Sequence, residues 1–554
     1  MYACPNCNSN IKFDPATQKM RCTYCDTLIS PHDKMFTRGA DEEKGIGDDE
    51  YEITYYTCPQ CGGELMTDDN TAATFCSYCG ASTILEMRVG TEKKPDYIIP
   101  FKKTREDCVK EYKKVLRRAL FAPNELRKDE TVDRFRGIYM PYWIYNVNTD
   151  GRFSAEGSVS KRRGDYIYTN RYGVGGDVKA DYDGIAYDAS SSFEDRLSEA
   201  IAPFDVKESD EFTSAYLSGF YADTGDVEAV LYDEEAKKLV MTDIARQAYR
   251  DKQYSSHGVT ATSVEEALMR TPADVKHKLG MFPVWFLSNQ SGDRVSYAVV
   301  NGQTGRVAMD LPIDIRKYFI GVAAFAVPLF LIFVFLSAKA DLVMSPRVML
   351  GIIFLLSIIA LILADKQADE LFMREMLFTD RGYNSKRTPE QVKETQEQLN
   401  GNVKIKKAKP KTTSGSGGFG QAIFYGFMTY VVLNFLPINL FAGFAFTAAI
   451  LVAVIALIAG IIGKSTISKE RVIVRAPMSK KIGTSIFPII AMIISALMWV
   501  INPINDMFYY VIAVIGIVMI GVCVSKLVAR HNTLTSRKLP QFNKRGGEEH
   551  ENDQ

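Results

Sequence analysis

The chain has 554 residues, which is more than one ordinary domain needs, and its formal net charge is zero. That zero is the sum of two unlike parts. Residues 1–316 hold 40 Lys and Arg against 51 Asp and Glu, whereas residues 317–554 hold 26 against 15. The acidic first part argues against general electrostatic binding of nucleic acid. No cationic, apolar leader precedes Cys4, so export of the N-terminus is not expected.

The first predicted elements are two copies of one cysteine motif, C-x2-C, fourteen residues, C-x2-C, at residues 4–25 and 58–79. This spacing is typical of zinc ribbons in a reducing compartment such as the cytosol, and a disulfide framework is the alternative. Four thiolates close the tetrahedral shell of Zn²⁺ and leave no position for a substrate water, so we predict two structural zinc sites. The predicted ligands are Cys4, Cys7, Cys22, Cys25, Cys58, Cys61, Cys76 and Cys79.

Each C-x2-C pair is followed by a residue that tolerates positive φ, and these residues are Asn8, Asp26, Gly62 and Gly80. A turn with that geometry points backbone N–H groups at the thiolate sulfurs. The fourteen residues between the two pairs suffice for a short hairpin, which in the first copy has its turn at DPAT.

Zinc ribbons of this kind resemble those of general transcription factor B and of primosomal helicases, which suggests DNA as a partner. The charge argues otherwise, because residues 1–30 carry a balance of +1 and residues 51–90 carry −4. We therefore expect protein docking or structural capping. A membrane-tethered, nucleic-acid-binding protein stays as the alternative function.

A mixed region follows at residues 95–316. Thr104 and Asp107 form a capping box, which predicts a helix that runs to about residue 120. Aromatic and β-branched runs predict strands at 137–159 and 165–187, two helical stretches follow near 192–202 and 226–250, and further strands close the region.

Two segments of this region look alike, GIYMPYWIY at 137–145 and LGMFPVWFL at 279–287. Trp143 and Trp285 would then be equivalent positions of a duplicated sheet, in its core rather than in a ligand cleft. The five histidines show no metal or triad spacing, and RYGVGGDV lacks the following helix that a phosphate loop needs. We therefore do not expect an enzyme.

The last part of the chain is apolar. About 20 apolar residues cross a hydrocarbon core, and six such helices fit the sequence. The predicted spans are 319–338, 348–364, 421–436, 440–463, 486–501 and 508–525. They contain no ionisable residue that is clearly internal, which favours an anchor and assembly surface. A transporter or channel is the second alternative.

Lys and Arg predict the orientation of these spans, because eleven lie between spans two and three, six between spans four and five, and six after span six. Both termini and these loops are therefore expected in the cytoplasm, in a multi-pass protein of the plasma membrane. The basic loop is expected to contact anionic lipid through Lys404, Lys406, Lys407, Lys409 and Lys411.

The predicted fold class is tandem zinc ribbons plus a β-rich α+β cytosolic domain, followed by an all-α multi-pass transmembrane region of about six helices. The predicted organisation is zinc ribbon 1 at 1–30, an acidic linker at 31–54, zinc ribbon 2 at 55–90, the β-rich cytosolic domain at 95–316, transmembrane helices 1–2 at 317–365, a basic cytosolic loop at 366–420, transmembrane helices 3–4 at 421–463, a basic cytosolic loop at 464–484, transmembrane helices 5–6 at 485–526, and a cytosolic tail at 527–554.

Several stretches of the sequence resemble one family: the double ribbon, MPYWIYNV, APFDVKESDEFTSAYLSGFYAD, and FPVWFL…YAVVNGQTGRV followed by membrane spans. The family consists of bacterial membrane-anchored double zinc-ribbon proteins, also described as TFIIB-type zinc-ribbon proteins. The resemblance implies that the eight cysteines bind zinc. It also implies a membrane recruiter that binds cytosolic or membrane-associated proteins, such as PspA-like or SPFH-domain proteins, under envelope stress.

Overall fold

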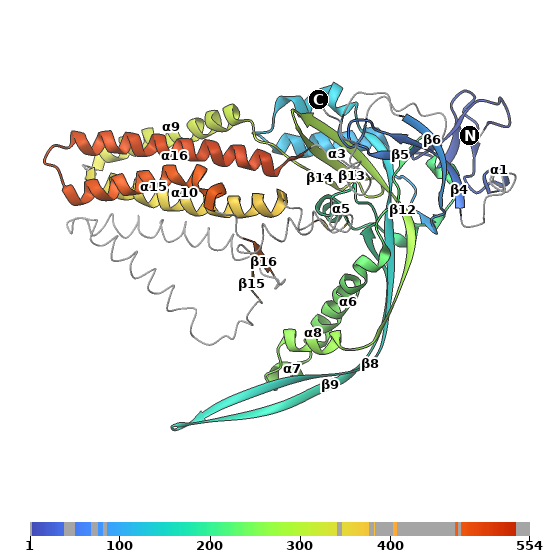
Figure 1. Ribbon diagram of the computed structural model, residues 1–554, viewed down its shortest axis with the longest axis horizontal. Helices are drawn as coiled ribbons and strands as arrows, with labels where there is room; N and C mark the ends of the chain where they lie inside the picture. Colours follow the sequence, from blue (N-terminus) through green and yellow to red (C-terminus); the bar gives the residue numbers. More distant parts are fainter. Residues whose placement is uncertain are drawn as a thin grey trace. The chain divides into compact units, whose positions relative to one another are not determined.

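A computed structural model of the protein describes residues 3–37, 50–67, 76–80, 86–340, 346–375, 380, 382, 403–406, 471–474 and 478–538. The chain divides into two compact units, which Figure 1 colours in chain order. Unit 1 comprises Met1–Pro312, Leu377–Val392 and Thr535–Gln554, and unit 2 comprises Ile313–Met376 and Lys393–Leu534. Unit 1 is rich in β-structure, and the long helices of unit 2 are apolar.

The first cysteine motif folds as a small antiparallel sheet of its own. Its elements are β1 (Ile11–Asp14), β2 (Lys19–Cys22) and β3 (Leu28–Ile29), followed by the short helix α1 (Lys34–Thr37). The turn between β1 and β2 forms where DPAT predicts it, because the Asp14 carboxylate accepts a hydrogen bond from the backbone N–H of Ala16 at 3.0 Å. Ile11 and Phe13 alternate with more exposed residues and are buried.

The second cysteine motif joins a much larger sheet of twelve strands among the described residues. Its strands are β4 (Glu50–Thr57), β5 (Glu64–Thr67) and β6 (Glu86–Lys93). The other members are β7 (Tyr97–Ile98), β8 (Arg136–Arg163), β9 (Tyr166–Asp188), β10 (Asp210–Glu211), β11 (Tyr221–Ala222), β12 (Ala273–Ser291), β13 (Arg294–Asn301), β14 (Val307–Met309) and β17 (Arg537–Lys538). The main path runs β10-β7-β12-β8-β11-β5-β4-β6, so β5 connects the second motif to the centre through β11.

The register between β8 and β12 supports the predicted duplication. Met140 of β8 pairs with Phe282 of β12, and each tryptophan lies three residues further along its own strand. A two-fold axis through this pair therefore exchanges Trp143 and Trp285. The neighbouring strands follow the same symmetry: β11 runs parallel to β8 where β7 runs parallel to β12, and β9 and β13 pair antiparallel with them.

Trp285 is buried in the core, as predicted, whereas Trp143 is half-buried against a second apolar cluster, and both indole nitrogens have a partner. Trp143 Nε1 donates to the carbonyl oxygen of Val227 at 2.7 Å, and Trp285 Nε1 donates to that of Lys103 at 2.9 Å. These bonds satisfy the only polar atom of each side chain, so the rings can fill apolar space without leaving a buried donor unpaired.

Unit 1 contains six further α-helices among its described residues, of which the first, third and fourth lie in stretches that the sequence predicts as helical and the other three do not. They are α3 (Arg105–Arg118), α4 (Asp129–Val132), α5 (Asp195–Ile201), α6 (Asp233–Ala248), α7 (Lys252–Ser256) and α8 (Ala261–Met269). The capping box at α3 is confirmed, with Thr104 and Asp107 each bonding the backbone of the other. The glycine-rich RYGVGGDV lies within β9, not between strands, and β8 and β9 form a hairpin that projects from the sheet (Figure 1).

Unit 2 contains four long helices among its described residues: α9 (Ile315–Ala340), α10 (Pro346–Glu375), α15 (Met478–Ile501) and α16 (Met507–Leu534). Three described segments are long and apolar enough to cross a membrane: Met349–Met373, Lys481–Ile501 and Met507–Leu534. They contain the predicted fifth and sixth spans and all but the first residue of the predicted second span, and the predicted first span lies within α9. The predicted third and fourth spans lie outside the described residues.

Side chains hold α10, α15 and α16 together. Ala360, Ala364, Cys523 and Leu527 form a buried apolar cluster. At one end of these helices the Lys481 ammonium pairs with the carboxylates of Asp365 at 2.5 Å and Asp369 at 2.8 Å. Two short strands, β15 (Val403–Lys406) and β16 (Arg471–Val474), also pair in this unit. Lys404 and Lys406 lie on β15, whereas Lys407, Lys409 and Lys411 lie outside the described residues.

Candidate metal centres

The eight predicted ligands form two separate clusters, and within each the four sulfur atoms lie within 4.8 Å of one another. In cluster 1 (Cys4, Cys7, Cys22 and Cys25) three of the sulfur–sulfur separations are 3.4, 3.4 and 3.6 Å. In cluster 2 (Cys58, Cys61, Cys76 and Cys79) two of them are 3.7 and 3.8 Å. All eight cysteines are free thiols, so the disulfide interpretation is wrong for the described residues.

These separations fit a metal ion held by four thiolates. Zinc–sulfur bonds of about 2.3 Å at tetrahedral angles place sulfur atoms about 3.8 Å apart. Cluster 2 matches that spacing, and cluster 1 is slightly tighter. Four ligands from one chain complete the shell, which suits a structural metal. Each cluster could therefore hold one metal ion.

The turns after the cysteine pairs have the predicted backbone conformation. The φ angles are 58° at Asn8, 56° at Asp26, 70° at Gly62 and 75° at Gly80. In the first turn of cluster 2 the Gly62 N–H donates to the Cys58 carbonyl oxygen at 2.7 Å. The next amide, that of Gly63, points at a thiol and donates to the Cys61 sulfur at 3.4 Å. Such contacts offset the negative charge of a four-thiolate site.

One thiol of cluster 1 is already predisposed to ionise. The Thr27 hydroxyl lies 3.0 Å from the Cys25 sulfur, and together with the Thr27 backbone N–H it lowers the pKa of Cys25 to about 6. A thiolate is the form that binds metal, so this side chain is ready as a ligand at neutral pH.

The two clusters differ in their surroundings. All four cysteines of cluster 2 are buried, and they pack in one apolar cluster with residues of β8, β12 and β13. The Tyr297 hydroxyl of β13 donates to the Tyr78 carbonyl oxygen, between the last two ligands, at 2.6 Å. In cluster 1, by contrast, Cys25 is exposed and Cys7 is half-buried.

Cluster 1 is connected to the rest of unit 1 through its hairpin and through its two buried cysteines, Cys4 and Cys22, which belong to an apolar cluster that also contains residues of α3 and β8. The Phe13 ring meets the Tyr216 ring edge-on at 4.9 Å, and the Ser218 hydroxyl donates to the Ile11 carbonyl oxygen at 2.8 Å. On the opposite side the second cysteine turn presents Tyr24, which is 81% exposed. The sequence motif does not distinguish these environments, because it specifies only the local turn.

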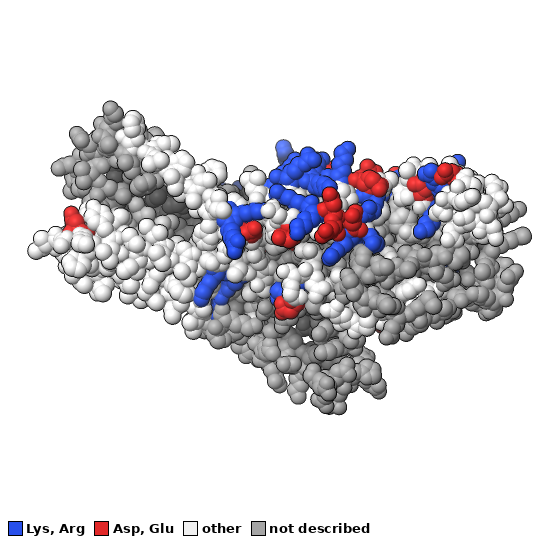
Figure 2. Space-filling model, turned by 90° about the horizontal axis from the view of Figure 1, so that it is seen from above, with Lys and Arg blue, Asp and Glu red and all other residues white. Residues whose placement is uncertain are grey.

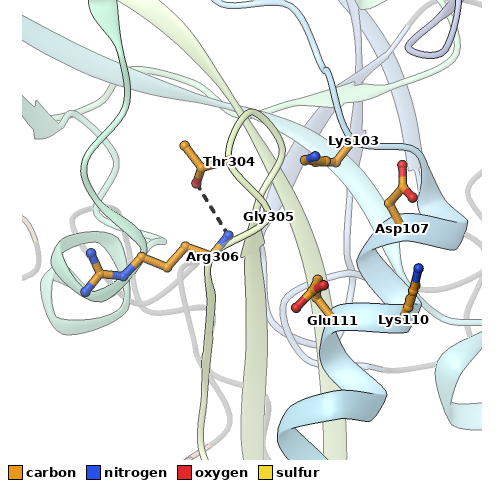
Figure 3. A pocket seen from close by; sticks show the side chains of 7 residues that line it. All are labelled: Lys103, Asp107, Lys110, Glu111, Thr304, Gly305 and Arg306. Carbon is orange, nitrogen blue, oxygen red and sulfur yellow. Dashed lines mark hydrogen bonds between the residues drawn. The ribbon is translucent and has the colours of Figure 1, made fainter.

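A pocket of about 460 Å³ lies between the start of α3 and the turn that joins β13 to β14 (Figure 3). Its lining residues are Lys103, Asp107, Lys110, Glu111, Thr304, Gly305 and Arg306. The Arg306 guanidinium points away from α3 in this view and donates to the Ala202 carbonyl oxygen. The remaining lysines are balanced by two carboxylates, so the pocket does not offer a concentrated positive charge to a phosphate.

The basic α3 itself is part of a mixed surface. Figure 2 shows Lys and Arg side chains interspersed with Asp and Glu in this region. Lys113 pairs with Asp129 at 3.1 Å, and Arg105 pairs with Asp133 at 3.0 Å. These pairs engage two of the six cations of α3, and Lys114 pairs with Glu111 of the same helix at 3.2 Å, which agrees with a solvated helix face.

The described residues thus define a membrane-associated protein with two tetracysteine clusters in a β-rich unit. The chain is similar to a protein of Bacillus subtilis (strain 168) described as "Uncharacterized protein YdjG". The two are 28% identical over 333 residues, which cover 58% of this chain and 94% of the relative. No family model matches the chain, and no solved structure matches it.

Proposed function

We propose that the protein is a non-enzymatic, multi-pass protein of the plasma membrane. Its two zinc-loaded ribbons and β-rich domain form a cytosolic head that binds protein partners. The observation that carries this proposal is the contrast between the two closed four-thiolate clusters. Cluster 2 is enclosed in the core, whereas cluster 1 lies at the surface on a chain that also contains membrane-length helices.

The contacts in unit 2 support the expected topology. The Ile313 N–H donates to Asn532 Oδ1 at 2.7 Å, and Asn532 Nδ2 donates back to the Ile313 carbonyl oxygen at 2.8 Å. The start of the first predicted span therefore adjoins the end of the sixth. Lys481 joins the start of the fifth to Asp365 at the end of the second, and β15 pairs with β16 across the two basic loops. An even number of spans between these points puts them on one side.

A protein partner fits cluster 1 better than nucleic acid does. The exposed turn carries Tyr24 and, nearby, Leu28, which is partly exposed. The Arg21 guanidinium pairs with the Asp26 carboxylate at 2.8 Å, so it already has an anionic partner in the absence of a phosphate. Apolar and aromatic side chains without a surplus of cations favour a protein surface. The resemblance to double zinc-ribbon proteins suggests PspA-like or SPFH-domain proteins as the first partners to test.

The test uses the full chain in its own membrane. A photo-crosslinking residue at position 24 should capture discrete proteins that mass spectrometry identifies, and Cys22→Ser should abolish those adducts because it unfolds the ribbon. The same residue at the exposed position 130 of α4 serves as the control. Adducts to nucleic acid at position 24, or adducts that do not require Cys22, would contradict the proposal.

If the protein were instead a membrane-tethered nucleic-acid-binding protein, a gel-shift experiment would give a positive result. The purified full chain in detergent would then shift DNA or RNA in a gel at physiological salt, with an affinity that falls steeply as salt rises. We expect no such shift, because residues 1–316 carry eleven more acidic than basic residues.

A further inference from the structure

The hairpin of β8 and β9 extends far beyond the sheet. Pairing of β8 with β12 ends at Thr149, but pairing of β8 with β9 continues from Asp150 to Arg163. At about 3.3 Å per residue, these fourteen residues form a two-stranded ribbon roughly 45 Å long. Figure 1 shows α7 and α8 alongside this ribbon and its end projecting past them.

The helices cover only the base of this ribbon. Phe153, Ala155 and Val178 pack in an apolar cluster with residues of α6, α7 and α8. The helices stop covering the ribbon near Gly157 and Gly258. The backbone of the ribbon and that of the segment after α7 are in close contact there, since a Cβ at Gly258 would lie 2.2 Å from the Ser158 carbonyl oxygen. Beyond this point all residues from 160 to 171, which we call the hairpin tip, are exposed.

The hairpin tip combines large apolar side chains with basic ones. Tyr166, Ile167 and Tyr168 are 73%, 69% and 59% exposed. The register places a basic residue directly opposite each of them, in the pairs Arg163–Tyr166, Arg162–Ile167 and Lys161–Tyr168. Because directly paired residues share a face, both faces of the ribbon present an apolar group beside a cation.

The charge of the tip also differs from that of its surroundings. Residues 160–171 contain four basic residues and one acidic residue, a balance of +3, within a region of 316 residues whose balance is −11. Among the described residues, Tyr166, Ile167 and Tyr168 are more than half exposed, so they gain little stability from burial. These residues are therefore better explained by a ligand than by folding.

We propose that the hairpin tip binds the surface of an anionic lipid bilayer. Tyrosine rings favour the interfacial layer of a membrane, and Lys and Arg are attracted to acidic headgroups. The chain supplies membrane-length helices of its own, so it meets lipid at high effective concentration. Single-stranded nucleic acid could also stack on tyrosines, but Ile167 at the centre of the triplet offers no stacking surface.

The experiment places the full chain in lipid nanodiscs with an environment-sensitive fluorescent residue at position 166. In discs rich in phosphatidylserine we expect a blue shift and quenching by brominated lipid, and in neutral phosphatidylcholine discs we expect neither. The same probe at the exposed position 156, on the helix-covered part of the ribbon, is the matched control and should stay unquenched.

Charge variants sharpen the test. Each of Lys161→Gln, Arg162→Gln and Arg163→Gln should lower the ratio of inserted to free tip about fivefold, since one basic residue near anionic lipid is worth about 1 kcal/mol. These side chains are exposed, so metal content and the near-UV spectrum should not change. Equal quenching in neutral discs, no quenching in either disc, or shielding of the probe only by added oligonucleotide would each overturn the proposal.

Discussion

Two regions with one cysteine spacing have become different parts of this molecule. Both clusters have the same positive-φ turns and nearly the same sulfur separations. Cluster 2 is nevertheless enclosed by the central sheet, and cluster 1 lies beside it with Cys25 exposed. The motif therefore determines the geometry of the metal site. The neighbouring strands determine whether the metal stabilises the whole unit or only a module at its surface.

The largest effect is expected for Cys61→Ser in cluster 2. Binding of a structural zinc ion contributes roughly 10–16 kcal/mol in small modules, which matches or exceeds the 5–15 kcal/mol of a typical domain. Since Cys61 is fully buried beneath β12 and β13, we expect unit 1 as a whole to lose its fold. Zinc content and the near-UV circular dichroism of the purified chain would report this loss.

The control is Cys108→Ala, which removes a buried thiol of α3 that belongs to neither cluster. It should keep both metal ions and lower stability only moderately. A Cys61→Ser chain that holds one zinc ion and retains a native near-UV spectrum would mean that cluster 2 is no more central than cluster 1.

A smaller effect is expected for Cys22→Ser in cluster 1. The variant should lose one of two zinc ions and unfold locally, because this motif folds as a three-stranded sheet, β1–β3, that is separate from the twelve-stranded sheet. Limited proteolysis should then cut within residues 4–30 and leave the central sheet intact. Cooperative unfolding of all of unit 1 would erase the distinction between the two clusters.

A substitution at Phe13 should separate metal binding by cluster 1 from the packing of the first ribbon against the rest of unit 1. Phe13 is 4% exposed and contacts Tyr216 and Phe220, so Phe13→Ala should weaken the attachment of the ribbon by about 3–5 kcal/mol. The cysteines are untouched, and zinc content should stay at two. Hydrogen exchange should accelerate in β1 and in the Ser218 region, where the Phe13 N–H donates to the Ser218 carbonyl oxygen at 3.1 Å. Loss of the metal would show that docking and folding of the ribbon are inseparable.

Much of the local geometry could be predicted from the sequence. Asn8, Asp26, Gly62 and Gly80 adopt positive φ because the residue type itself controls that preference. The same holds for the capping box at Thr104, whose partner lies three residues away. The equivalence of the two tryptophan-containing strands could also be predicted, because the two segments have similar sequences.

The environment of each cluster could not be predicted, because it depends on contacts between distant residues. Cluster 2 is buried since β5 pairs with β11 at Met66 and Ala222, and no local signal specifies that pairing. The exposure of the hairpin tip could not be predicted for a related reason. YIY after RRGD predicts an ordinary strand, and only the three-dimensional structure shows that Tyr166 is 73% exposed.

The smallest expected effect is a dependence of folding stability on pH. It should arise only from a buried carboxyl group near cluster 2. Burial raises the pKa of Asp223, beside Ser190 and close to Tyr78, to about 7. Between about pH 4, the ordinary value, and pH 7 the folded state holds a proton that the unfolded state has lost. Folding stability from this group is therefore present at low pH and falls as pH rises through that window, by about 1 kcal/mol per pH unit.

The measurement compares urea unfolding of unit 1 in the full chain at pH 5, 6 and 7 for the native sequence and for Asp223→Asn. The amide oxygen can accept the hydrogen bond from the Thr224 N–H, and the amide nitrogen can donate to the Ser190 hydroxyl, without titrating, so the variant should gain stability over the native chain as pH rises. Asp165→Asn, at an exposed position, should run parallel to the native sequence. If the Asp223→Asn curve also runs parallel, the carboxyl is ionised in the folded state, and the core around cluster 2 is more polar than its burial suggests.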